Sequence, residues 1–130
     1  MTDAMVQGFV VDSFTIKSDT IKVILKGEKD NIRAGIDDIG GVVTLLEICA
    51  TAGKEAPINC TLLYNALETT TFQHPFVVVD FVVKQDFIKL KLEAVEVENG
   101  TSMEDVAKSL TLHAREREDK PVELALPGTI

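Results

Sequence analysis

Two stretches of the chain carry the same alternation of apolar and charged residues. The first runs over 14–25 and the second over 81–92, so that corresponding residues are 67 positions apart. Each stretch has a short polar connection in its middle, which is typical of an antiparallel hairpin with one buried face. This repeat constrains the fold more than composition does, because both halves of the chain should then form the same unit.

A helical pattern follows each hairpin. In segment 35–57, polar residues recur at spacings of three and four, and Gly53 is placed to end the helix. Segment 99–118 has an apolar stripe with the same periodicity. A proline and a short alternating run come next, starting at Pro57 in one half and Pro121 in the other. The order strand, strand, helix, strand therefore occurs twice.

These patterns predict an α+β fold built from an internally duplicated ββαβ unit. The expected architecture is an antiparallel sheet with two helices packed on one face. The 130 residues suit a single domain with one core, with pseudo-repeats at about 1–66 and 67–126 and a tail at 127–130. Residues 64–74 join the halves, and their pattern fits both a helical turn and a continued strand.

Asp80 interrupts the apolar run 76–83. A carboxylate there is either a catalytic group in the core or a residue on the wetter face of a strand. Alternation places Asp80 on the face opposite Phe81. We therefore interpret Asp80 as an outward-facing residue of the scaffold.

The remaining polar residues define no catalytic or metal site. No spacing joins His74 or His113 to a nucleophile, so an exposed or capping role is expected for both. Cys49 and Cys60 stand in apolar surroundings and form no CxxC pair, which indicates buried, reduced thiols. We predict no metal and no cofactor, and the sequence leans away from an enzyme.

The nearest approach to a ligand loop precedes the first helical pattern. Glycines allow close approach to the backbone, and a helix N-terminus attracts anions. Two neighbouring aspartates would repel a phosphate, however, and a helix-capping role for one of them is the favoured interpretation. The residues of this possible ligand loop are Asp37, Asp38, Gly40 and Gly41.

Lysines form the basic cluster that occurs in both hairpins. They are candidate contacts for nucleic acid or for a partner, and the alternative is a solvated face that protects strand edges. The net charge of −8 opposes general attraction to nucleic acid or to anionic membranes. The candidate residues are Lys17, Lys22, Lys26, Lys84, Lys89 and Lys91.

The duplicated strand-and-helix unit in an acidic chain resembles, in topology alone, one domain of a DNA sliding clamp. The resemblance implies a role associated with nucleic acid. The chain departs from the clamp pattern because no clamp motif is present and the first helix has no basic face. Topology by itself does not determine function.

The leading hypothesis is a non-enzymatic binding or assembly protein that forms homo-oligomers, with an unidentified protein partner also possible. It depends on the lack of a catalytic constellation and on strand edges that need cover. One alternative is a nucleic-acid-associated module, clamp-like or single-strand binding, that uses the lysines. Another is a small-molecule binder or enzyme with a pocket between protomers. No apolar stretch suits a membrane span and the N-terminus has no signal-peptide pattern, so we expect a cytoplasmic protein without a membrane partner.

Overall fold

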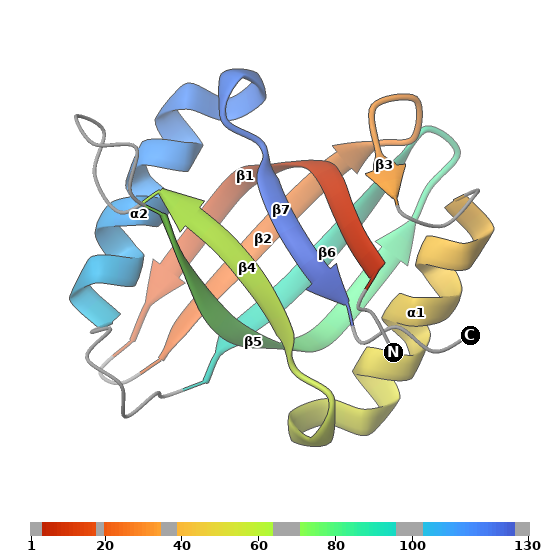
Figure 1. The fold of residues 1–130 in the computed structure, drawn as a ribbon, viewed down its shortest axis with the longest axis horizontal. Helices are drawn as coiled ribbons and strands as arrows, with labels where there is room; N and C mark the ends of the chain where they lie inside the picture. Colours follow the sequence, from red (N-terminus) through yellow and green to blue (C-terminus); the bar gives the residue numbers. More distant parts are fainter. Residues whose placement is uncertain (1–3, 18–19, 35–38, 64–70, 96–102, 127–130) are drawn as a thin grey trace.

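The computed structural model describes residues 4–17, 20–34, 39–63, 71–95 and 103–126. The strands and helices form two similar series along the chain (Figure 1). The first series comprises β1 (Ala4–Ile16), β2 (Ile21–Glu28), β3 (Arg33–Ala34), α1 (Ile39–Ala52), the 3-10 turn η1 (Gly53–Glu55) and β4 (Ile58–Leu63). The second comprises β5 (Thr71–Val83), β6 (Phe87–Ala94), α2 (Met103–Glu116), the 3-10 turn η2 (Arg117–Asp119) and β7 (Val122–Leu126).

Six of these strands close into an antiparallel barrel in the order β1, β2, β6, β5, β4, β7 and back to β1. The predicted α+β sheet with two helices on one face is therefore wrong. Pairing of β2 with β6 and of β4 with β7 joins the two halves on both sides and closes the sheet. One face of the sheet therefore lines the barrel interior, where two helices cannot pack side by side. The helices lie at opposite sides of the barrel (Figure 1), with α1 against β5 and α2 against β1 and β4.

The two long strands are shared between neighbours. β1 pairs with β7 up to Phe9 and with β2 beyond it, while β5 pairs with β4 up to Phe76 and with β6 beyond it. Both phenylalanines are fully buried where the strand changes partner. The β1–β2 register shifts around Asp12 and the β5–β6 register shifts around Val79. Such bulges bend a strand and help a sheet to close.

The two series correspond in fine detail. β1 and β5 both have 13 residues, β2 and β6 both have 8, and the two helices both have 14. Each helix is followed by a residue with positive φ, Gly53 (59°) in one half and Arg117 (42°) in the other. These correspondences agree with a ββαβ unit used twice. An origin by duplication stays a prediction.

The barrel interior and the inner faces of both helices form one apolar core. Cys49 and Cys60 are buried in it, and burial raises their pKa values to about 11 and about 12, which keeps both thiols protonated. The expectation that the histidines are exposed is wrong, because His74 and His113 are 1% and 3% exposed. The His113 Nδ1 lies 2.8 Å from the carbonyl oxygen of Lys120, the residue that follows η2. A helix-capping role stays a prediction.

Asp80 is exposed and lies directly opposite Lys91, so the interpretation of Asp80 as an outward-facing residue is confirmed. Its Oδ1 accepts a hydrogen bond of 2.9 Å from the Phe81 backbone N–H. The bulge at Val79 shifts the alternation by one residue. Among the described helices, none is both long and apolar enough to cross a membrane.

Candidate functional site

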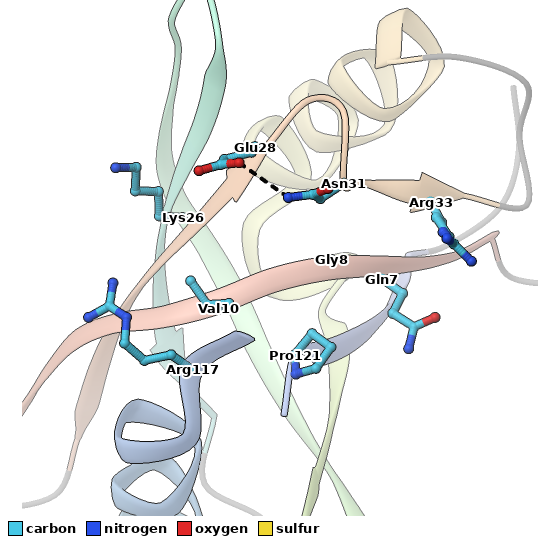
Figure 2. A pocket seen from close by; sticks show the side chains of 9 residues that line it. All are labelled: Gln7, Gly8, Val10, Lys26, Glu28, Asn31, Arg33, Arg117 and Pro121. Carbon is cyan, nitrogen blue, oxygen red and sulfur yellow. Dashed lines mark hydrogen bonds between the residues drawn. The ribbon is translucent and has the colours of Figure 1, made fainter. Parts of the chain in front are cut away.

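A hollow of about 340 Å³ lies on the outside of the barrel, over the first half of β1 (Figure 2). The turn between β2 and β3 forms one wall, and η2 with the start of β7 forms the other. Backbone and side chains of β1 form the floor between them. The lining residues are Gln7, Gly8, Val10, Lys26, Glu28, Asn31, Arg33, Arg117 and Pro121.

Gly8 in the floor is a position that only glycine fits. Its φ is +116°, which L side chains rarely adopt, and a β-carbon there would overlap the Asn31 carbonyl oxygen and lie 2.9 Å from Ile32 Cα. The β1–β7 register shifts at this residue, between Gln7 and Phe9. Gly8 is therefore an extra residue in β1. The corresponding strand of the second half, β5, pairs with β4 without such a shift. Bulges of this kind are frequent beside functional sites.

The charged groups around the hollow are mostly cationic. Lys26, Arg33 and Arg117 contribute three positive charges and Glu28 one negative charge, in a chain whose net charge is −8. The three cations come from β2, β3 and η2 respectively. A local excess of positive charge in a concave site attracts small anions, so the hollow differs in sign from the protein as a whole.

Several of these side chains already have weak, solvent-accessible partners. Arg117 Nη2 lies 3.7 Å from Asp12 Oδ1, and the Lys26 Nζ lies 5.0 Å from the centre of the Phe87 ring. The Asn31 Nδ2 donates a hydrogen bond of 3.2 Å to Glu28 Oε2, which fixes both side chains on the same wall (Figure 2). Exposed contacts of this type are worth about 1 kcal/mol or less, so a ligand can replace them.

The corresponding surface of the second half does not carry these charges. The two hairpins are related by 67 positions, so the counterpart of Lys26 in the second half is Glu93. The two helix ends are related by 64 positions, so the counterpart of Arg117 in the first half is Gly53. The fold therefore does not require cations at these places.

Arg117 also has a backbone conformation that glycine adopts more easily. Its φ of 42° matches the 59° of Gly53, and the left-handed region costs a non-glycine residue about 1 kcal/mol. A strained residue beside a pocket is a reason to look for a role of its side chain. The Arg117 guanidinium is the group that this position provides to the hollow.

The substitution Arg117→Gly tests that interpretation. We expect the free energy of unfolding to stay the same or rise by up to about 1 kcal/mol, because relief of the left-handed φ offsets the extra entropy of the unfolded chain. Urea denaturation measures the change. The control Arg115→Gly, inside α2, should lose about 1 kcal/mol. A loss as large for Arg117→Gly would mean that the arginine is there for packing.

The structure brings four of the six candidate lysines together. Lys22 and Lys26 lie on β2 beside β6, which carries Lys89 and Lys91, and Lys26 is directly opposite Lys89. Lys17 and Lys84 are in the two hairpin turns, which the antiparallel β2–β6 register places at opposite ends of this strand pair. Of the six, Lys26 alone lines the hollow.

The possible ligand loop is not part of this hollow. Asp37 and Asp38 lie outside the described residues, and Gly40 and Gly41 are in the first turn of α1. Sequence reasoning did not single out Gln7, Gly8 or Arg33. A signal existed for Gly8, because a glycine within an alternating run indicates a bulge or a close backbone approach.

Comparison of the chain with protein-family models, with curated proteins and with solved structures found no match. The chemistry of the hollow is therefore the basis on which a ligand can be inferred. Guanidinium groups donate paired hydrogen bonds to carboxylates and phosphates, and an ammonium adds a point charge. Over the described ranges, no group of three or more His, Cys, Asp or Glu side chains is placed to hold a metal ion.

Proposed function

We propose that this chain is a non-enzymatic binding protein that holds a small anionic ligand in the hollow over β1. The observation that carries the proposal is the convergence of Lys26, Arg33 and Arg117 around the Gly8 floor. These cations come from three separate elements of an acidic chain. A volume of about 340 Å³ is at the lower end of the range for small-molecule sites. The lining offers no pairing of a nucleophile with a base.

The charge distribution favours a small anion over a polyanion. A polymer would extend beyond the hollow and meet the field of a chain with net charge −8. Salt screens such fields over about 8 Å at physiological ionic strength, so a ligand confined to the hollow interacts mainly with its lining. The lining residues of the hollow all belong to one chain, which favours a site within a protomer over a pocket between protomers.

An oligonucleotide is the second candidate ligand, because the structure groups Lys22, Lys26, Lys89 and Lys91 on neighbouring strands. Asp80 and Glu93 lie directly opposite Lys91 and Lys22 and offset part of this charge. Binding that weakens steeply with salt and is lost in Lys22→Glu with Lys89→Glu would favour this candidate. That double substitution should weaken binding to the hollow much less, because neither Lys22 nor Lys89 lines it, although Lys89 lies directly opposite Lys26.

Self-association and a cytoplasmic location are also part of the proposal. The sequence-based hypothesis of self-association depended on strand edges that need cover. In the closed barrel these edges pair with one another, so they no longer support it. What supports a contact between copies is instead the exposure of Val79, Val82 and Val83 on β5, at 41–47%. Light scattering across protein concentrations tests this point independently of the hollow.

The proposed site predicts one-to-one binding of small anions in low salt. Isothermal titration calorimetry with succinate and with inorganic phosphate measures it. We expect Arg33→Gln to weaken the binding of succinate about tenfold, because a charge-assisted hydrogen bond contributes about 1.5 kcal/mol. A wild-type protein that binds no anion would contradict the proposal.

A matched control separates the hollow from the general field of the protein. Arg115→Gln removes the same charge from an exposed position on α2 that does not line the hollow. Its affinity for both anions should remain close to that of the wild type. An equal loss in both variants would assign the effect to net charge, and the proposed site would then be wrong.

A further inference from the structure

We infer that the ligand of this hollow carries two anionic groups separated by a polar segment. The inference rests on the proposed function and specifies its ligand class. Figure 2 shows Arg33 and Arg117 at opposite ends of the hollow with Gly8 between them, and Lys26 at the same end as Arg117. One anionic group would bind Arg33, and the other would bind the end formed by Arg117 and Lys26.

The middle of the hollow is suited to neutral hydrogen-bonding groups. Glu28 and Asn31 lie on one wall and are joined by their hydrogen bond, while Gln7 lies across the floor from them (Figure 2). The Glu28 carboxylate repels a third anionic group and accepts hydrogen bonds from a hydroxyl or an amine. These features describe a dianion with a hydroxyl- or amine-bearing centre.

Asp12 supplies an internal anion at one end of the hollow. Its carboxylate lies 3.7 Å from the Arg117 guanidinium, and the two side chains are 34% and 51% exposed. An ion pair this accessible contributes about 0.2–1 kcal/mol. We expect an anionic group of the ligand to take the place of Asp12 at Arg117. Removing Asp12 should therefore strengthen ligand binding, an effect that a damaged fold would not produce.

The experiment compares ligands that carry one and two anionic groups of the same kind. Calorimetry would use acetate, succinate and adipate as the carboxylate series, and inorganic phosphate with fructose 1,6-bisphosphate as the phosphate series. In at least one series, a ligand with two anionic groups should bind at least about tenfold tighter than the singly headed one. The series that shows the effect identifies the head group as carboxylate or phosphate.

Two substitutions make the test specific for the two ends. Arg33→Gln should reduce the affinity for the ligand with two anionic groups to the affinity for the ligand with one. Asp12→Asn should raise the affinity for the dianion by about 1.4- to 5-fold, the range that corresponds to an exposed ion pair. The control Asp86→Asn makes the same charge change in the exposed β5–β6 turn, beside the wall of the hollow but without a described ion pair to a lining cation, and should change the affinity less than Asp12→Asn does.

The outcomes separate this inference from the proposed function. One outcome is that ligands with one anionic group bind as tightly as ligands with two in both series, while Arg33→Gln still weakens binding. The inference of a two-ended ligand is then wrong, and the proposed anion site stands. If Asp12→Asn has no more effect than Asp86→Asn, the exchange of Asp12 for a ligand group is wrong. If the wild type binds none of the five anions, the proposed function itself fails.

Discussion

Replacing Gly8 by alanine is expected to lower the free energy of unfolding by about 3 kcal/mol or more. The φ of +116° strains any L side chain, and the new β-carbon would overlap the backbone of Asn31. Backbone atoms cannot move aside as the end of a flexible side chain can, so the β2–β3 turn must shift away from β1. Urea denaturation measures the stability, and binding of succinate or phosphate should be lost with it.

Gly53→Ala is the matched control. Gly53 also has a positive φ, of 59°, but a β-carbon there would meet no atom within 4 Å. Only the backbone strain remains, and the expected loss is about 1 kcal/mol. Equal losses for the two variants would show that the close approach of Asn31 to β1 contributes nothing, and the account of the hollow's floor would then be wrong.

Lowering the pH from 7 to 5 is expected to destabilise the protein, by up to about 1.4 kcal/mol per pH unit for each buried histidine. Burial lowers the pKa values of His74 and His113 below the usual 6.5, and nearby backbone groups at Val95 and Lys120 oppose that shift only in part. The unfolded chain therefore binds protons first as the pH falls. The stability is fully present above about pH 6.5 and is lost between that value and the lower pKa of the folded state.

His74 and His113 can be separated by substitution. Urea denaturation of the wild type, His74→Leu and His113→Leu at several pH values between 7.5 and 5 measures the slope. Each variant should lose one histidine's share of the pH dependence. His74 packs edge-on against Phe76 with ring centres 5.3 Å apart. A slope that persists unchanged in both variants would contradict the assignment.

The local structure of this chain could be predicted from the sequence because alternation and helical periodicity report directly on which face is buried. Both hairpins and both helices are where the patterns place them, and Gly53 has the left-handed conformation expected after a helix. The closure of the barrel could not be predicted in this way. Alternation shows which side of a strand is buried but not which distant strand lies beside it.

The β2–β6 pairing shows why the pattern of charges does not predict which strands lie side by side. Lys26 lies directly opposite Lys89, and like charges in that position are mildly destabilising. Buried residues on the inner side of the same strands, such as Leu25 opposite Leu90, decide the pairing instead. The expected antiparallel sheet with two helices on one face would have left strands with exposed edges, and the barrel pairs those edges.

The candidate site was largely hidden from sequence reasoning because its residues are not neighbours in the chain. Arg33 and Arg117 are far apart in sequence, and only the barrel brings β3 and η2 to the two ends of one hollow. In the sequence alone, Arg117 is equally well explained as a cation near a helix C-terminus. The positive φ that sets it apart is a property of the folded backbone. Lys26 was singled out with the hairpin lysines, but its neighbours in the site were not.

The most direct test of an anion site over β1 is a titration of ¹⁵N-labelled protein with succinate and then with inorganic phosphate, followed by two-dimensional NMR. Saturable shifts are expected for the backbone amides of Gly8, Asn31 and Arg33 and for Arg117, with little change at Lys89 and Lys91. Shifts centred on Lys89 and Lys91, or none that saturate, would contradict the account.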